Sequence, residues 1–194
     1  MGVDWDRVSD WTARIVSGDV GPMRSVFLAD NADVPEIVWE PDAAVTAVAP
    51  LRFVLESWWP AAAAGALPHI RQINPFTLRP ALGYIMLLDP VEAGRDFRYR
   101  LFGSTVARIS KFDRTGRLLS EQPTSPYVNE FSLASYRASL QQRRPLYTVR
   151  MPARAEITAK WPRVIIPCVD DAGSVARMLG VTAAVDATGR MIRA

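Results

Sequence analysis

The chain has 194 residues, of which 49% are hydrophobic and 22% charged, and its formal net charge is +3. This composition is ordinary for a globular chain, and the length suits one domain with extensions or two very small ones. The single cysteine excludes an intramolecular disulfide framework and a multi-cysteine zinc site.

No basic segment followed by an apolar run opens the chain, so we expect no secretory signal. The longest apolar runs fall far short of the ~20 residues that span a bilayer. We therefore expect a cytoplasmic protein with no membrane contact.

Acidic residues are concentrated near the N-terminus. Residues 1–42 contain nine acids and three arginines, whereas residues 43–194 contain eleven acids and twenty bases. We expect this acidic arm to lie on the basic body or on a neighbouring copy of it. Every base except Lys111 and Lys160 is arginine, a bias that coding composition explains as readily as phosphate binding. We therefore do not expect nucleic acid as the partner.

Residues 4–17 have the pattern of a short helix, which Asp4 can cap and Gly18 ends. Such a short helix cannot bury its apolar stripe alone, so the stripe must pack on the body or on a partner. The predicted dimer or partner contact consists of Trp5, Val8, Trp11 and Ile15. Residues 18–49 show weak periodicity and read as an irregular or partly helical linker. We therefore divide the chain into an N-terminal extension, residues 1–49, and a domain with its helical lead, residues 50–194.

The domain begins with a clearer helix, whose apolar residues recur at i, i+3, i+4, i+7 and i+8 from Leu51 onwards. Proline-rich sequence then predicts short helical turns up to about residue 81. "LGYIMLLDP" reads as a strand buried on both faces. "FRYRLFG" alternates, with Phe97, Tyr99 and Leu101 on one face. These two segments predict a hairpin.

The second half of the domain predicts helical turns at 104–112, a longer helix at 127–142, and three further strands. These strands are "PLYTVRMPA", "WPRVIIPCV" and "VARMLGVTAAV". The order from residue 82 is therefore β-β-α-α-β-β-β, which is an α+β class of fold.

This element order, over about 110 residues, resembles that of a PAS domain. The local motifs also resemble one branch of the family, small stand-alone bacterial single-PAS proteins with a helical N-terminal lead. The motifs are "LPHIRQINP", "ALGYIMLLDP", "FRYRLFGS" followed by "TGRLLSE", "RRPLY" and "WPRVIIPCVDDAGSVARMLG". The resemblance covers roughly residues 50–185.

The resemblance implies a PAS-like five-stranded antiparallel sheet with helices on one face, enclosing a possible ligand cavity. It also implies sensing or protein interaction, usually as a dimer. Our candidates for the cavity lining are Tyr99, Leu101, Val106, Ile109, Phe131, Trp161, Val164 and Ile166. A one-residue error in strand register would exchange inward and outward residues.

The residues that could carry chemistry are few. His69, the only histidine, is expected to be a surface or capping residue, and Cys168 to behave as a small hydrophobe. The paired acids Asp170 and Asp171 lie in a predicted turn. We expect no metal site and no cofactor. Haem is disfavoured because no histidine lies on the helices beside the sheet, where an axial ligand would be needed. Flavin is disfavoured because the Asn-Cys-Arg motif of photosensing PAS domains is absent. Trp161 is expected either to cover the cavity mouth, to stack with a neighbouring arginine two residues on, or to pack as an ordinary core tryptophan.

The leading prediction is a non-enzymatic cytoplasmic PAS sensor or adaptor that binds a small molecule or a protein partner. It would signal through dimer or partner contacts, and we expect a homodimer and a signalling protein partner. The expectation of no catalysis rests on the scarcity of groups for acid–base work. Two alternatives remain open. One is an α+β enzyme that uses His69 with an acid or a tyrosine, and the other is a nucleic-acid-binding module.

Overall fold

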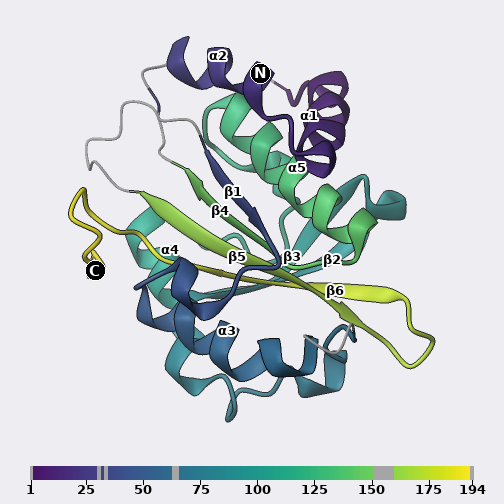
Figure 1. The fold of residues 1–194 in the computed structure, drawn as a ribbon, viewed down its shortest axis with the longest axis vertical. Coiled ribbons are helices and arrows are strands. Elements are labelled where there is room, and N and C mark those ends of the chain that lie inside the picture. Colours follow the sequence, from purple (N-terminus) through teal and green to yellow (C-terminus); the bar gives the residue numbers. More distant parts are fainter. Residues whose placement is uncertain (1, 30–31, 33–34, 63–65, 151–159, 193–194) are drawn as a thin grey trace.

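The computed structural model describes residues 2–29, 32, 35–62, 66–150 and 160–192 (Figure 1). The α-helices are α1 (Trp5–Ser17), α2 (Gly21–Ala29), α3 (Ala49–Ala62), α4 (Ser104–Ser110) and α5 (Pro126–Gln142). The strands are β1 (Glu36–Trp39), β2 (Ile85–Val91), β3 (Asp96–Phe102), β4 (Leu146–Arg150), β5 (Trp161–Val169) and β6 (Val175–Thr182). They form one antiparallel sheet in the order β1-β4-β5-β6-β2-β3.

The predicted order β-β-α-α-β-β-β is confirmed by β2, β3, α4, α5, β4, β5 and β6. The structure adds a sixth strand, because β1 pairs with β4 and places Val38 opposite Tyr147. β1 comes from the segment expected to be linker, so this part of the N-terminal extension belongs to the sheet. Four residues give only two alternations, which is too short a pattern to predict a strand.

Helices cover both faces of the sheet (Figure 1). The face that we call the inner face packs against α1, α2 and α5 in one hydrophobic core. The outer face packs against α3 and the 3-10 turn Arg79–Tyr84 in a second core. The expected layer of helices on one face is therefore present, and the lead helix α3 adds a layer on the other face to bury its own apolar stripe. Within the described segments, no helix has both the length and the apolar character needed to cross a bilayer.

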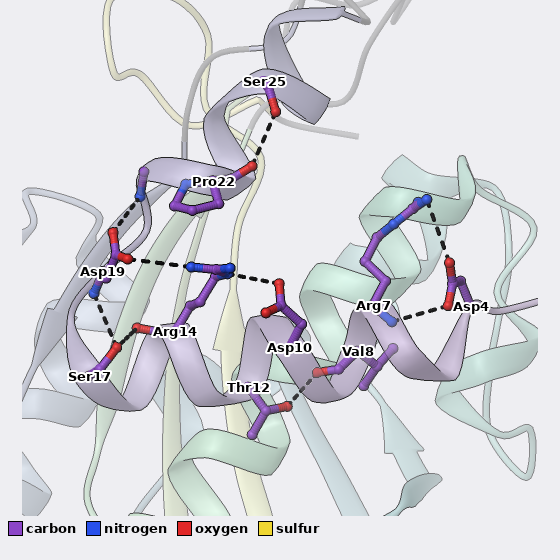
Figure 2. Close-up of polar contacts among 11 residues, drawn as sticks. Asp4, Arg7, Val8, Asp10, Thr12, Arg14, Ser17, Asp19, Pro22 and Ser25 are labelled. Carbon is purple, nitrogen blue, oxygen red and sulfur yellow. Dashed lines mark hydrogen bonds and ion pairs between the residues drawn. The ribbon is translucent and has the colours of Figure 1, made fainter.

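α1 begins and ends as its sequence predicts. The Asp4 side chain accepts hydrogen bonds from the backbone N–H groups of Asp6 and Arg7, and Figure 2 shows the bond with Arg7. Gly18 closes the helix at φ 80°. Arg14 extends along the exposed side of the helix to both Asp10 and Asp19 (Figure 2).

The apolar stripe of α1 does not form an exposed surface. Val8, Trp11 and Ile15 are each at most 2% exposed in the core that α1 shares with α5. Trp5 is half-buried, and the Arg95 guanidinium carbon lies 4.4 Å from its ring centroid. The expectation that this stripe forms an intermolecular contact is therefore wrong for this conformation, because α5 of the same chain already covers it.

The acidic arm lies on the body of its own chain. Glu40, which follows β1, forms an ion pair with Arg144 at the end of α5. The Nη1 atom of Arg7 in α1 lies 2.8 Å from the buried Glu130 carboxylate of α5. Both ends of the arm are therefore fixed to the body by ion pairs in addition to apolar packing.

A bulge in the β2–β3 hairpin changes which side chains face inward. Leu88 pairs with Tyr99 but Leu87 pairs with Leu101, so Arg100 is an extra residue on β3. Leu101 is consequently turned to the outer face and is 39% exposed. The prediction that Tyr99 and Leu101 share a face was wrong because a strict period of two has no place for a bulge.

Candidate ligand pocket

A cavity of about 220 Å³ lies at the inner face of the sheet, beside α4 and the segment 110–124 that follows it. Its apolar wall consists of Met86, Phe102, Val106 and Phe112. Its polar wall consists of Tyr99, Ser110, Arg114, Gln122, Thr124, Ser132, Arg150, Arg163 and Thr182, and Pro123 and Trp161 complete it. The lining therefore combines apolar side chains with many hydrogen-bond donors.

Of the eight side chains predicted to line a cavity, the structure places Tyr99, Val106 and Trp161 around this one. Leu101, Val164 and Ile166 lie on the outer face, the last two in the core with α3. The β5 residues on the inner face are instead Trp161, Arg163 and Ile165. Grouping Trp161 with Val164 was a register error of one residue, which exchanges the two faces of a strand.

The remaining two predicted residues lie on the inner side but do not line the cavity. Phe131 of α5 is fully buried and packs edge-to-face on Phe27 of α2, with ring centroids 5.6 Å apart. Ile109 is a half-buried residue of α4 and is not among the residues that line the cavity. α1 and α2 both pack against α5 in this core.

Three arginines converge on the cavity, each stacked on an aromatic ring. The guanidinium carbon of Arg114 lies 5.6 Å from the ring centroid of Phe102. The corresponding distance is 5.9 Å from Arg150 to Trp161. Arginine lies favourably over aromatic faces because the ring carries negative charge on its face. Trp161 thus stacks with Arg150 across the strand pair, instead of with the arginine of its own strand.

The third arginine, Arg163, is the most buried, with only 7% of its surface exposed. Its guanidinium carbon lies 5.1 Å from the ring centroid of Tyr136 of α5. Its Nε and Nη2 atoms are buried without a hydrogen-bond partner, as are Nε and Nη1 of Arg114. The hydroxyl oxygens of Tyr136 and Thr148, both on the inner side of the sheet, are also unpaired. Unpaired buried donors are rare in native proteins, so this cluster requires an explanation.

The polar wall is strongly electropositive. None of the described side chains that line the cavity is a carboxylate. Burial, together with the nearby charges of Arg163 and Arg114, lowers the pKa of Arg150 to about 9. Burial also lowers the pKa of Arg114 and raises the pKa of the Tyr99 hydroxyl. The cavity therefore holds positive charge that its own described lining does not neutralise.

The loop beside the cavity is held by a small hydrogen-bond network. The Gln122 side-chain amide donates to the Tyr99 hydroxyl oxygen at 2.5 Å. The Asn129 side-chain amide of α5 donates to the carbonyls of Ser120 and Gln122, at 3.1 and 3.0 Å. These bonds connect β3, the loop and α5, so the wall that carries Gln122 is positioned by α5.

The other reactive side chains lie away from the cavity. His69 caps a 3-10 turn by accepting from the Arg71 backbone N–H, and its Nε2 atom lies 3.1 Å from the Asp171 carboxylate. The capping role expected for His69 is thereby confirmed. Cys168 is buried in the outer core, where burial raises the pKa of its thiol to about 12. In the described part of the chain, no group of three His, Cys, Asp or Glu residues could hold a metal ion.

The sequence reasoning missed Arg114 and Arg150 entirely. Arg114 follows the helical turns predicted at 104–112, and Arg150 lies in the predicted strand "PLYTVRMPA". One signal was available, because Arg150 and Arg163 both fall on the inner face once Leu146 and Ile165 are placed there. An arginine on a core-facing position without an acid in register is unusual.

No protein-family model and no curated protein sequence matches the chain. Among solved structures, it is similar to a light-oxygen-voltage domain studied with a flavin analogue, at 17% identity and a TM-score of 0.45, over 61% of this chain and 90% of that one. It is also similar to an RNA-binding light-oxygen-voltage receptor, at 16% identity and a TM-score of 0.43. That match covers 80% of this chain but only 39% of the receptor.

These similarities correct one expectation. We expected flavin to be disfavoured, but one of the similar solved structures is a light-oxygen-voltage domain described with a flavin analogue. The sequence motifs, the order of the elements and the antiparallel sheet together identify the fold of this chain as PAS-like.

Proposed function

We propose that this chain is a sensor or adaptor domain that binds a small molecule in the inner-face cavity and passes the event to another protein. The observation that supports this proposal most is the cluster of buried, unpaired polar atoms on Arg114, Arg163, Tyr136 and Thr148. Folding leaves such groups unpaired at a cost of about 1–3 kcal/mol each. Arg114 and Arg163 line the cavity, and Tyr136 and Thr148 lie next to Arg163, which supports a site that is built for a polar ligand.

Helix α5 connects the cavity with the N-terminal helices α1 and α2. Three consecutive residues of α5 face different partners: Ser132 lines the cavity, Phe131 packs on Phe27 of α2, and Glu130 binds Arg7 of α1. A ligand that displaces α5 would therefore alter how α1 and α2 are seated. The output in this proposal is a change in the exposure of α1 and α2, which a partner protein or a second copy would detect.

A homodimer remains part of the proposal, but we no longer assign its interface to particular residues. The stripe of α1 can serve as a contact only when the helix leaves α5. Light scattering of the protein, with and without a bound small molecule, tests this point. If the protein is monomeric under both conditions, the homodimer is excluded and the signal can pass only to a different protein.

The binding proposal is tested by native mass spectrometry of the purified full chain, followed by its absorption spectrum. A bound molecule that is released on denaturation supports the proposal. Visible absorbance would identify a chromophore such as a flavin, and an excess of absorbance at short ultraviolet wavelengths that ribonuclease removes would identify RNA. Ser110→Trp, which fills the cavity from α4, should reduce binding, whereas Ser25→Trp on the exposed side of α2 should not. Equal binding by both variants would contradict the site.

A further inference from the structure

The three arginines of the cavity form a single cluster. Arg150 and Arg163 project from neighbouring strands on the same face, where Thr148 is opposite Arg163 and Trp161 is opposite Arg150. Their strand positions are therefore diagonal neighbours, which lie about 7–8 Å apart in an antiparallel pair. Arg114 reaches the same cavity from the loop after α4. Like charges this close repel one another unless an anion lies between them.

The carboxylates of the surrounding elements are used elsewhere. Asp96 on β3 accepts hydrogen bonds from the backbone N–H groups of Phe97 and Ser120. Glu130 on α5 binds Arg7 and the backbone of Asp4. Asp113 accepts from the backbone and the hydroxyl of Thr115. None of these acids is paired with a cavity arginine, so the described chain does not supply its own counter-ion.

The aromatic stacking leaves the binding edges of the arginines available. The guanidinium carbons lie 5.1 to 5.9 Å from the ring centroids, and a guanidinium carries its N–H groups in its own plane. Arg114 leaves Nε and Nη1 unpaired, which do not share an edge, whereas the unpaired Nε and Nη2 atoms of Arg163 lie on one edge of its guanidinium. A carboxylate or a phosphate accepts two parallel hydrogen bonds from such an edge. The buried donors of Arg163 and Arg114 are therefore free to bind an anion.

On the basis of the proposed function, we propose that the small molecule is an anion whose carboxylate or phosphate group is bound by Arg150 and Arg163, with Arg114 closing the site from the loop. The remainder of the ligand lies against Met86, Phe102 and Val106. An apolar or aromatic body of modest size fits that wall and a cavity of about 220 Å³. Because the arginines gather around a concavity of about 220 Å³, we expect a small molecule to fit them better than a nucleic acid strand does.

Thermal unfolding and calorimetric titration of the full chain test this inference with three matched probes. Benzoate and phenyl phosphate carry the two candidate anionic groups, and benzamide is the neutral control of similar size. We expect one or both anions to raise the midpoint of unfolding and benzamide to have little effect. The anion that binds more tightly distinguishes a carboxylate ligand from a phosphate ligand.

Variants locate the binding site. Arg150→Gln and Arg163→Gln should each weaken binding of the preferred anion about 10-fold or more, as expected for the loss of a charge-assisted hydrogen bond. Arg114→Gln, in the loop, should also weaken binding and does not depend on the strand core for its folding. Arg24→Gln removes the same charge from the exposed side of α2 and should leave affinity unchanged.

The outcomes separate the two proposals. If benzamide binds as well as benzoate and only Ser110→Trp prevents binding, the cavity is a ligand site but the anion inference is wrong. If an RNA oligonucleotide displaces the anion and binds more tightly, the cluster is a nucleic-acid contact. If none of the probes binds, and the purified chain carries no small molecule, both proposals are overturned.

Discussion

The Arg163 guanidinium lies over the ring of Tyr136, with its central carbon 5.1 Å from the ring centroid. This contact joins the middle of the sheet to the middle of α5. Burial raises the pKa of the Tyr136 hydroxyl, which has no hydrogen-bond partner, so Tyr136 remains neutral beneath the cation. The position of Arg163, and with it the polar wall of the cavity, therefore depends on how closely α5 approaches the sheet.

Gly180→Ala is expected to disturb this approach. A Cβ atom at Gly180 of β6 would overlap the Tyr136 hydroxyl oxygen and lie 3.1 Å from the Met86 methyl group. Overpacking of this kind costs about 1–3 kcal/mol of stability. Denaturant unfolding should show the loss, and adding Tyr136→Phe should recover part of it by removing the overlapping oxygen. A Gly180→Ala variant as stable as the parent would show that α5 moves freely on the sheet.

Arg150→Met is expected to stabilise the protein in the absence of an anionic ligand. The pKa of Arg150 is lowered to about 9 by burial and by Arg163 and Arg114, so the folded state disfavours its charge. The unfolded pKa is 12.5, so this destabilisation is fully present at neutral pH and declines only as pH rises beyond about 9. Methionine fills similar space without charge, and a gain of about 1 kcal/mol would raise the unfolding midpoint by about 2–4 °C.

The control for this prediction is Arg24→Met, whose exposed side chain should leave the midpoint within about 1 °C. A lower midpoint for Arg150→Met would mean that the stacking of Arg150 on Trp161 outweighs the cost of burying its charge. If Arg150→Met is more stable than the parent and also loses anion binding, the arginine cluster is retained for binding at the expense of stability.

Periodicity and capping signals in the sequence predicted most of the fold. Asp4 and Gly18 delimit α1 as their chemistry requires, and the hairpin of β2 and β3 follows its apolar run and turn. The cavity was harder to predict, because a bulge and a one-residue offset between strands decide which side chains face it. Local sequence patterns could not predict that Arg114, Arg150 and Arg163 line the same cavity, because the three arginines come from separate segments of the chain.

α5 illustrates the same limit. Its sequence shows no single polar face, and nearly all of Tyr127–Ser139 is buried. That pattern arises because α5 lies between the sheet and α1, a position that could be inferred only by knowing where α1 docks. Glu130 is buried for the same reason, and its partner is 123 residues away.

Glu130→Ala is expected to loosen α1 from α5. The change leaves the Arg7 guanidinium and the backbone N–H of Asp4 without their acceptor. Losing an acceptor for a charged donor costs about 1–3 kcal/mol. Hydrogen exchange should accelerate across the amides of α1 more than across those of β5. Glu56→Ala, which breaks only the exposed pair with Arg52, should change exchange in α1 very little, and a uniform effect of Glu130→Ala would contradict a specific docking role.

The ion pair between Glu40 and Arg144 is expected to make the stability of the β1 edge depend on pH. The hydrogen bond from Arg144 lowers the pKa of Glu40 from 4.5. A carboxylate with a lowered folded pKa contributes stability above its unfolded pKa and loses it as pH falls through the folded one. The contribution should therefore be complete at neutral pH and decline below about pH 4.5.

Glu40→Gln removes that contribution, so its unfolding midpoint should lie slightly below that of the parent at neutral pH. The difference should shrink towards zero as pH falls well below 4.5, because protonation neutralises Glu40 in the parent as well. Both side chains are nearly half exposed, so we expect a small effect that also weakens with added salt. Glu56→Gln serves as a matched control, because its carboxylate pairs within one helix and does not join β1 to α5. A gap between the parent and Glu40→Gln that widens in acid would show that the ion pair does not hold the β1 edge.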